Sequence, residues 1–228
     1  MLLSVNDPRI SRVTRSKEQA RKSYDRLSCW YDWLAGPSEW KWTRLALQHL
    51  NAQEGEHVLE IGFGTGRALQ ELTQSVGESG RVFGVDISPG MLAVSQRRLA
   101  KAGLSERAEL RLGDAAALPF NDGSMHAVFI SFTLELFDTP EIPVVLAECR
   151  RVMRSGGRLV VLSLVMREPK GVAIRLYEWA HENIPNYVDC RPIYLQEAIE
   201  SADFNNNDTR EFSMWGLPGE IVIARKAT

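Results

Sequence analysis

Five short runs with strand character recur along the first two thirds of the chain, and helical patterns separate most of them. They are His57–Gly62, Arg81–Asp86, Ala108–Leu112, Met125–Phe132 and Arg158–Val165. Most of these runs are continuously apolar and rich in β-branched residues, and glycine or polar turn residues bound them, which is typical of buried strands. Strands that are apolar on both sides belong to a parallel sheet with helices on both faces. The sequence therefore predicts an α/β fold with a doubly wound, mostly parallel sheet.

The predicted helices between these strands have recognisable ends. Helices are expected over Thr65–Val76, Pro89–Lys101 and Thr139–Met153, the last one stopped by Gly156–Gly157. Ser88 is a suitable N-cap, Pro89 suits the first helical position, and Gly103 suits the C-terminal end.

The last third of the chain departs from this alternation. We expect helices over Val172–Glu182 and Ile193–Ala202, a loop at Asn205–Asp208, and strands around Thr209–Trp215 and Glu220–Arg225. Only residues 216–219 separate the two late strands, which predicts a hairpin and makes the last strand antiparallel to its neighbour.

Composition limits the function classes. The chain has 228 residues, a usual domain size, and its net charge of −2 argues against a nucleic-acid-binding domain. Three cysteines without a CxxC pair argue for a reducing compartment, and four histidines without ligand spacing argue against a metal site. No apolar run suits a signal peptide or a membrane span. We therefore expect a cytoplasmic protein that at most touches a membrane surface.

The first 50 residues have a character of their own. Seven basic and two acidic residues lie between Arg9 and Arg26, either as a solvated helix face or as a surface for an anionic partner or a membrane. An aromatic cluster follows, either as core or as a cover over an apolar substrate or a cation. Its members are Trp30, Tyr31, Trp33, Trp40 and Trp42, with Tyr24 just before them. We expect a helical lid over residues 1–50 and a binding domain over residues 51–228.

The first predicted strand ends in a glycine-rich turn that is typical of a nucleotide site. Gly62, Gly64 and Gly66 permit a sharp turn and a close ligand approach, and the next helix presents free N–H groups. The spacing is G-x-G-x-G, with Arg67 where a dinucleotide fingerprint needs its third glycine. Glu60 would repel a pyrophosphate and attract an ammonium group. These residues favour S-adenosylmethionine over NAD as the cofactor.

Acidic residues also follow the next two strands. Asp86 ends the second strand, where a carboxylate can accept hydrogen bonds from both ribose hydroxyls. Asp114 follows the third strand and is placed to accept a bond from an adenine amino group. Apolar residues that would sandwich the adenine are Ile87, Met91 and Leu118, and Ala115 and Ser131 complete the expected cofactor site.

Four segments then resemble successive motifs of the class I S-adenosylmethionine-dependent methyltransferases across residues 55–165. They are VLEIGFGTG, VFGVDIS, GDAAALPFNDGSMHAVF and RVMRSGGRLVV. The resemblance implies a seven-stranded sheet of order 3-2-1-4-5-7-6 with strand 7 antiparallel.

The N-terminal segment is similar to that of the ubiquinone/menaquinone-biosynthesis C-methyltransferases, through Lys17, Tyr24-Asp25 and Trp40-Lys41. Those enzymes usually carry an Arg-Asn pair after the fourth strand, and the run Ser131–Phe137 has neither residue. The acceptor therefore stays open between a quinol and another amphiphilic molecule such as a lipid.

Methyl transfer needs alignment, exclusion of water and, for most acceptors, a base. Tyr24, Tyr31 and Trp30 are candidates for facing the sulfonium. The candidate bases are His181 by its usual pKa and Glu135 by its place after the fourth strand. We expect a methyltransferase for a small apolar or amphiphilic acceptor. The alternatives are a non-catalytic module that binds S-adenosylmethionine or S-adenosylhomocysteine, and a nicotinamide-dependent oxidoreductase, against which the missing glycine argues.

Overall fold

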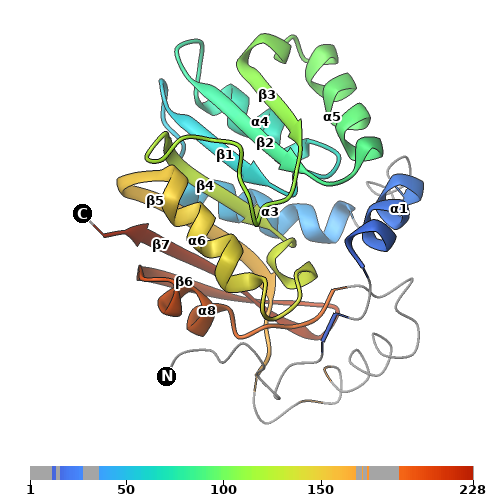
Figure 1. Ribbon diagram of the computed structural model, residues 1–228, viewed down its shortest axis with the longest axis vertical. Helices are drawn as coiled ribbons and strands as arrows, with labels where there is room; N and C mark the ends of the chain where they lie inside the picture. Colours follow the sequence, from blue (N-terminus) through green and yellow to red (C-terminus); the bar gives the residue numbers. More distant parts are fainter. Residues whose placement is uncertain are drawn as a thin grey trace.

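A computed structural model describes residues 12–13, 16–27, 36–167, 171, 174 and 190–227. Its centre is a seven-stranded sheet of order β3-β2-β1-β4-β5-β7-β6 (Figure 1). The strands are β1 His57–Ile61, β2 Arg81–Asp86, β3 Ala108–Leu112, β4 Met125–Ser131, β5 Met153–Leu164, β6 Phe204–Met214 and β7 Leu217–Lys226. Strands β1 to β5 pair in parallel, whereas β7 is antiparallel to both β5 and β6. The predicted fold and strand order are confirmed.

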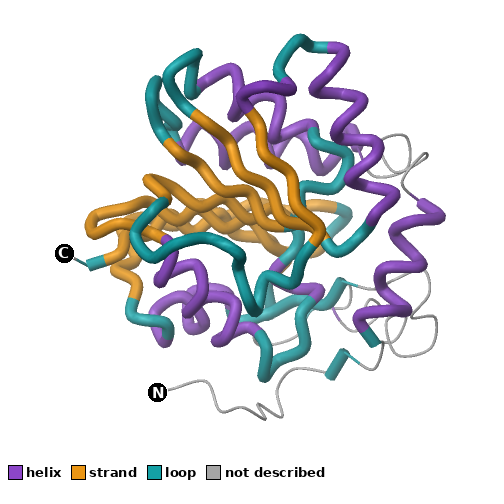
Figure 2. The backbone as a smooth tube through the Cα atoms, turned by 45° about the horizontal axis from the view of Figure 1, so that its top comes forward, coloured by secondary structure: helices purple, strands orange, loops and turns teal. Residues whose placement is uncertain are grey.

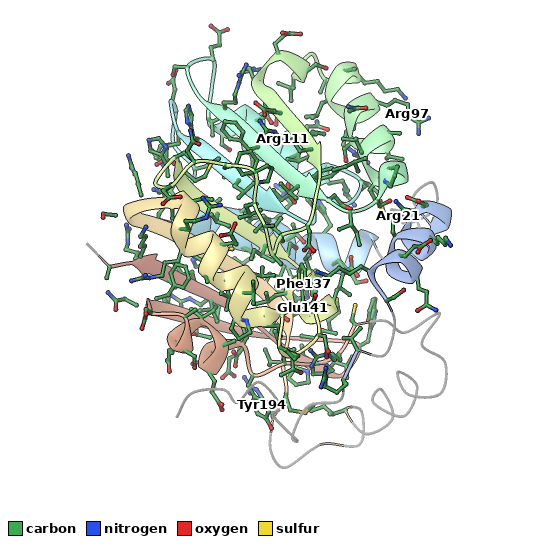
Figure 3. All side chains as sticks on the ribbon, viewed as in Figure 1. Arg21, Arg97, Arg111, Phe137, Glu141 and Tyr194 are labelled. Atoms are coloured by element: carbon green, nitrogen blue, oxygen red, sulfur yellow. The ribbon has the colours of Figure 1, made fainter. Side chains whose placement is uncertain are left out.

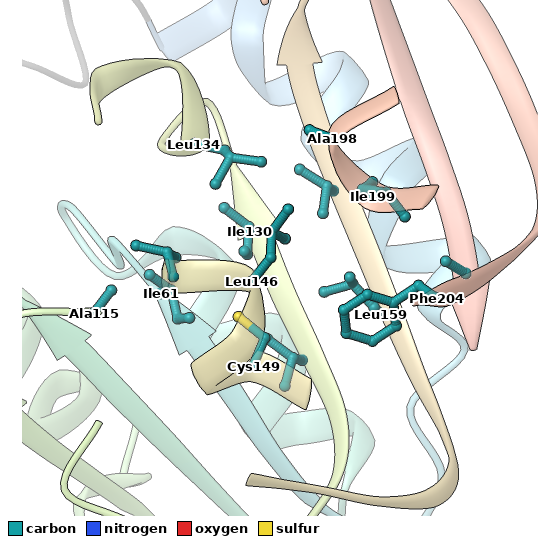
Figure 4. Packing of buried hydrophobic residues seen from close by; sticks show 14 of the residues in the cluster. Ile61, Ala115, Ile130, Leu134, Leu146, Cys149, Leu159, Ala198, Ile199 and Phe204 are labelled. Carbon is teal, nitrogen blue, oxygen red and sulfur yellow. The ribbon is translucent and has the colours of Figure 1, made fainter. Parts of the chain in front are cut away.

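Helices cover both faces of this sheet (Figure 2). The helices are α1 Lys17–Leu27, α3 Gly36–Leu50, α4 Arg67–Ser75, α5 Pro89–Lys101, α6 Ile142–Val152 and α8 Leu195–Ser201, with 3₁₀ turns η1 Ser105–Arg107 and η2 Leu134–Leu136. One core layer lies between the sheet and α6 and α8 (Figure 4), and the other between the sheet and α3, α4 and α5. In β4, Val128 and Ile130 enter the first layer while Ala127 and Phe129 enter the second. Burial on both faces explains the continuous apolar runs.

The helix ends follow local chemistry. Helix α5 has the predicted bounds, and the Ser88 hydroxyl accepts a hydrogen bond from the backbone N–H of Met91 at 3.1 Å, which confirms the N-cap. Helix α6 is shorter than predicted, because the Asp138 side chain accepts from the N–H of Thr139 and the Asp138 carbonyl accepts from Glu141, which makes a turn there. The glycines predicted to stop this helix lie inside β5, where the pairing with β4 shifts register.

The C-terminal hairpin is longer than predicted. The prediction of a loop at Asn205–Asp208 is wrong, because these residues belong to β6 and pair with β7. The pairing shifts register between Asn206 and Asp208, which leaves one extra residue on β6. Only Trp215 and Gly216 form the turn, with φ angles of 53° and 80°. Two central residues with positive φ are the type I′ arrangement that suits the strand twist.

Two other late predictions have different outcomes. Helix α8 begins two residues after the predicted start, because Ile193 forms a parallel bridge with Val165 instead. The helix predicted over Val172–Glu182 lies almost wholly outside the described residues.

Helix α1 lies beside α5, at the edge where the parallel strands end (Figure 1). In contrast, α3 belongs to the core, since Ala46 and Leu50 are fully buried against the sheet. Among the described helices, none is long and apolar enough to cross a bilayer.

The hairpin generates a stability prediction at Gly219. This residue pairs with Phe212, and an added Cβ would lie 2.1 Å from the Phe212 ring, which stacks on Trp42 at a centroid distance of 4.7 Å. We expect Gly219→Ala to lower the free energy of unfolding by about 1–3 kcal/mol, because the ring must move out of its packed position. Gly171→Ala is the control, since no atom of the described residues lies within 4 Å of its added Cβ. Urea unfolding measures both, and equal stabilities would contradict the packing described.

Candidate active site

Backbone hydrogen bonds bring the carboxyl ends of β1, β2 and β3 together. The N–H of Gly62 donates to the Val85 carbonyl at 2.8 Å, and the N–H of Gly113 donates to the Asp86 carbonyl at 3.0 Å. The N–H of Gly64 donates to the Asp86 side chain at 3.0 Å. The acidic residues that follow these strands therefore share one edge of the sheet, as open α/β folds require of a ligand site.

The three glycines after β1 serve different purposes. All have positive φ, at +70°, +50° and +79° for Gly62, Gly64 and Gly66. A Cβ on Gly62 would collide with Thr133, and one on Gly66 would collide with Ser95. A Cβ on Gly64 would meet no described atom within 4 Å, so this peptide faces open space in the described part of the chain. A ligand can approach the backbone at that point.

Glu60 is buried without a complete set of partners. The residue is 3% exposed, and no described residue gives its Oε2 atom a hydrogen-bond partner. Burial, with a further contribution from Asp86, raises the pKa of Glu60 well above its usual value. A buried carboxyl oxygen without a donor is costly, and an ammonium group would supply the donor. The residue therefore fits the amino group of S-adenosylmethionine.

Asp86 orders the loops around it. Its carboxylate accepts from the N–H groups of Gly64 at 3.0 Å and Ser88 at 2.9 Å. Burial raises the pKa of Asp86 to about 6, although these amides act in the opposite direction. Each carboxylate oxygen has a second lone pair, so the side chain can still accept bonds from two hydroxyls.

Asp114 has a partner that the sequence did not indicate. Its carboxylate accepts from the N–H of Ala116 at 3.0 Å and pairs with the Lys17 ammonium at 2.5 Å. Although burial acts to raise it, the Lys17 interaction leaves the pKa of Asp114 below its usual value. Of the apolar residues expected to sandwich the adenine, Met91 and Leu118 are buried and Ile87 is half-buried; Ala115, also expected in the cofactor site, is buried.

Side chains fasten α1 over this edge at both of its ends. At one end Lys17 bridges Asp114 and Glu141, the second at 2.7 Å. At the other end the Asp25 carboxylate accepts from the Ser88 hydroxyl at 2.6 Å and from the Gly90 N–H at 2.9 Å. Figure 3 labels Glu141 in the segment between β4 and α6 that Lys17 reaches.

A second polar region lies where β4 and β5 end. Glu135 in η2 is 0% exposed, and its Oε1 accepts from the N–H of Leu164 at 3.4 Å, while Oε2 has no partner among the described residues. Burial raises the pKa of Glu135 to about 8. Ser131, at the end of β4, shares a hydrogen bond of 3.1 Å with the Thr43 hydroxyl of α3.

Arg191 is the residue of this region that the sequence does not mark as buried. The residue is 1% exposed, and its Nη2 atom donates to the Phe137 carbonyl at 2.7 Å. Among the described residues, its Nε and Nη1 atoms have no partner. Burial lowers the pKa of Arg191 to about 10. An Arg-Pro pair in a loop is ordinary in sequence, so only the fold reveals this burial.

Some predicted site residues are not placed. Trp30, Tyr31 and His181 lie outside the described residues, and Tyr24 lies on α1 without a described side chain. Thr133 and Thr43 approach the site without a signal in the sequence. Among the described residues, no group of three or more His, Cys, Asp and Glu could hold a metal ion.

Comparison with known proteins identifies relatives over most of the chain. Residues 58–157 match the family described as methyltransferase domain. A demethylmenaquinone methyltransferase of Symbiobacterium thermophilum is 34% identical over 223 residues, which cover 84% of this chain and 87% of that protein. The demethylmenaquinone methyltransferase of Bacillus subtilis is 31% identical over 167 residues, covering 73% and 69%.

Solved structures share the fold. The [4+2]-cyclase SpnF superposes with a TM-score of 0.78 at 18% identity, covering 95% of this chain and 98% of that one. Geranyl diphosphate methyltransferase in complex with GPP and sinefungin superposes with a TM-score of 0.68 at 17% identity, covering 82% and 77%. At these identities the likeness concerns the fold alone. By its relatives and its motifs, the chain belongs to the class I S-adenosylmethionine-dependent methyltransferases, with S-adenosylmethionine as its methyl donor.

Proposed function

We propose that this enzyme methylates a small quinol-like acceptor, and that its acceptor site lies at the ends of β4 and β5. The names of the relatives from Symbiobacterium thermophilum and Bacillus subtilis support a quinone-type acceptor. The observation that carries the proposal is Glu135, a fully buried carboxyl group whose pKa of about 8 suits proton transfer near neutral pH.

We further propose how the chain holds its cofactor, which supplies an electrophilic methyl group. The unpartnered oxygen of Glu60 receives the amino group, and Asp86 receives the ribose hydroxyls. Asp114 accepts from the adenine amino group, with Ala115 and Ser131 nearby in the site. Ile87 and Met91 pack on the adenine ring, and the open face of Gly64 admits the ligand to the backbone.

The base acts on the acceptor's hydroxyl group under this proposal. A quinol ring carbon becomes a strong nucleophile when the hydroxyl loses its proton. Glu135 takes that proton, because its unpartnered oxygen is free to accept one. His181 remains the second candidate base, and its side chain lies outside the described residues.

Of the N-terminal 50 residues expected to form a lid, α3 belongs to the core, so the lid in this proposal is the part up to and including α1, and residues 51–228 form the binding domain. The ion pairs of Lys17 and the hydrogen bonds of Asp25 support the part of the lid that α1 contributes. Tyr24 and Tyr31 would then face the sulfonium. A cytoplasmic enzyme that touches a membrane surface through its basic first helix fits an apolar acceptor.

The direct test is methyl transfer to a reduced naphthoquinol. We expect the enzyme to move a labelled methyl group from S-adenosylmethionine to a ring carbon of 2-polyprenyl-1,4-naphthoquinol, kept reduced with dithionite. Mass spectrometry of the product locates the new carbon–carbon bond. Tight binding of the cofactor without transfer to this acceptor, together with transfer to a lipid headgroup amine, would overturn the quinol assignment.

The cofactor assignment predicts a role for the ionised Asp86. Asp86→Ala should weaken binding of S-adenosylhomocysteine about 10–100-fold, the usual effect of losing hydrogen bonds to a charged group. Wild-type affinity should also fall, by up to about tenfold per pH unit, as the pH drops below the Asp86 pKa of about 6. Isothermal titration measures both effects. The exposed Glu78→Gln is the control, and equal affinities of the two variants would remove Asp86 from the site.

Because Glu135 is both the proposed base and a buried carboxyl group, its replacement should lower activity and raise stability at high pH. Glu135→Gln should lower kcat about a hundredfold or more, since the base is lost. Because the folded pKa of about 8 exceeds the usual value of 4.5, the stability that protonation of Glu135 provides is complete below pH 4.5 and is lost as the pH rises through 8. As the pH rises from 5 to 8, the free energy of unfolding of the variant should therefore increase relative to that of wild type by a few kcal/mol, because about 1.4 kcal/mol corresponds to each pH unit between the two pKa values. Urea unfolding at pH 5 and at pH 8 measures this difference. If the free energy of unfolding changed equally with pH in the two proteins, the prediction would be contradicted.

A further inference from the structure

Two buried ionisable side chains at the ends of β4 and β5 keep polar atoms without partners. Within the part of the chain that the structure describes, Nε and Nη1 of Arg191 and Oε2 of Glu135 have no hydrogen-bond partner. Both residues are almost completely buried, at 1% and 0% exposure. Buried polar atoms normally have partners, and those without one are expected where a ligand supplies it.

Hydrogen bonds to the backbone connect both residues to the end of β5 and to the η2 turn. The N–H of Leu164 donates to Glu135, and the Leu164 carbonyl accepts from the N–H of Ile193 at 3.3 Å, two residues after Arg191. From the other side, Arg191 donates to the carbonyl of Phe137, two residues after Glu135. The end of β5 and the η2 turn therefore hold the two side chains in one neighbourhood.

Among the described residues, the buried Arg191 makes no ion pair, although Asp138 and Glu135 lie near enough to act on its charge. Within the described part of the chain it makes no ion pair with Glu135, and the nearby Asp138 is already paired with Arg12 at 2.6 Å. Asp138 also accepts from the N–H groups of Val13 and Thr139. Burying a guanidinium without an anionic partner is costly, so a contribution to the stability of the fold does not explain why Arg191 is buried.

We propose that Arg191 is a catalytic residue that binds the acceptor oxygen as an anion, beside the carboxyl of Glu135. This inference rests on the proposed function and deepens it, because it assigns the group that stabilises the deprotonated acceptor. One of the two remaining guanidinium donors, at Nε or at Nη1, would hold the acceptor oxygen in a charge-assisted hydrogen bond of the kind that suits oxyanions.

The proton and electron movements balance. Glu135 takes the hydroxyl proton, and the electron pair of that O–H bond stays on the oxygen that Arg191 holds. The ring carbon forms a bond to the methyl carbon while the bond between that carbon and sulfur breaks, and its electron pair stays on sulfur. The ring carbon then releases its own proton to solvent, and Glu135 returns the first proton to the oxygen.

Binding of an ionisable naphthol tests this role without turnover. We use 4-nitro-1-naphthol, whose naphtholate form absorbs visible light, in the presence of S-adenosylhomocysteine. Wild type should bind the naphtholate and lower the apparent pKa of the probe. Arg191→Gln should lose at least tenfold in affinity for the naphtholate and bind S-adenosylhomocysteine within twofold of wild type, while Arg191→Lys should lose less.

Other charged groups near Arg191 are considered in the titration. Glu135 and Asp138 act on Arg191 from the β4 side, Arg12 acts from the N-terminal segment, and Glu39 of α3 acts on Glu135. The titration is therefore repeated in Glu135→Gln, where the shift of the probe pKa should persist because Arg191 remains.

Activity and unfolding complete the test. With the naphthoquinol acceptor, Arg191→Gln should lower kcat at least a hundredfold, and the exposed Arg154→Gln should leave it within twofold. The thermal midpoint of Arg191→Gln should equal or exceed that of wild type, whereas a merely structural arginine would lower it. Unchanged naphtholate binding by Arg191→Gln overturns the inference. Absence of transfer by wild type, with Arg191-dependent naphtholate binding intact, overturns only the quinol acceptor.

Discussion

The carboxylate of Asp86 holds the carboxyl edge of this sheet in one arrangement. It accepts one hydrogen bond from the glycine loop after β1 and another from the start of α5, and its carbonyl accepts from the loop after β3. Three loops thus depend on one residue at the end of β2. This shared anchor explains why residues from separate motifs meet at one place, because the loops cannot move independently while Asp86 keeps its bonds.

Several ionisable side chains at this edge of the sheet have hydrogen-bonding atoms that no described residue of the protein binds. Among the described residues, Glu60, Glu135 and Arg191 all have buried polar atoms without partners. Burial raises the pKa of the two glutamates and lowers the pKa of Arg191, which in each case favours the neutral form. At another place in the described chain, the largely buried Arg158 is paired with Glu56. The two core layers supply the stability that such groups cost, through apolar side chains on both faces of β1, β4 and β5.

The sequence predicts the features of this fold that arise from local pattern. Apolar runs give the strands, Ser88 gives the cap of α5, and the glycines after β1 give the loop, since each depends on nearby residues alone. The strand at Asn205–Asp208 was not predictable, because pairing with β7 overrides the preference of asparagine for loops. Likewise, Lys17, Asp25 and Arg191 reach the site from distant segments, and no local pattern marks a side chain whose partner is far along the chain.

Arg191 also bears on the difference between this chain and the quinone enzymes it resembles. The segment Ser131–Phe137 lacks the Arg-Asn pair usual in those enzymes, and it carries Glu135 instead. Arg191, 54 residues beyond Phe137, donates to the carbonyl of Phe137 and so brings a guanidinium back to this segment. What methyl transfer to a quinol requires is a positive charge near the developing anion and a group to take its proton, and neither requirement fixes where in the chain the residue comes from. Under our proposal, an acid from η2 and a cation from the segment before α8 together meet both requirements.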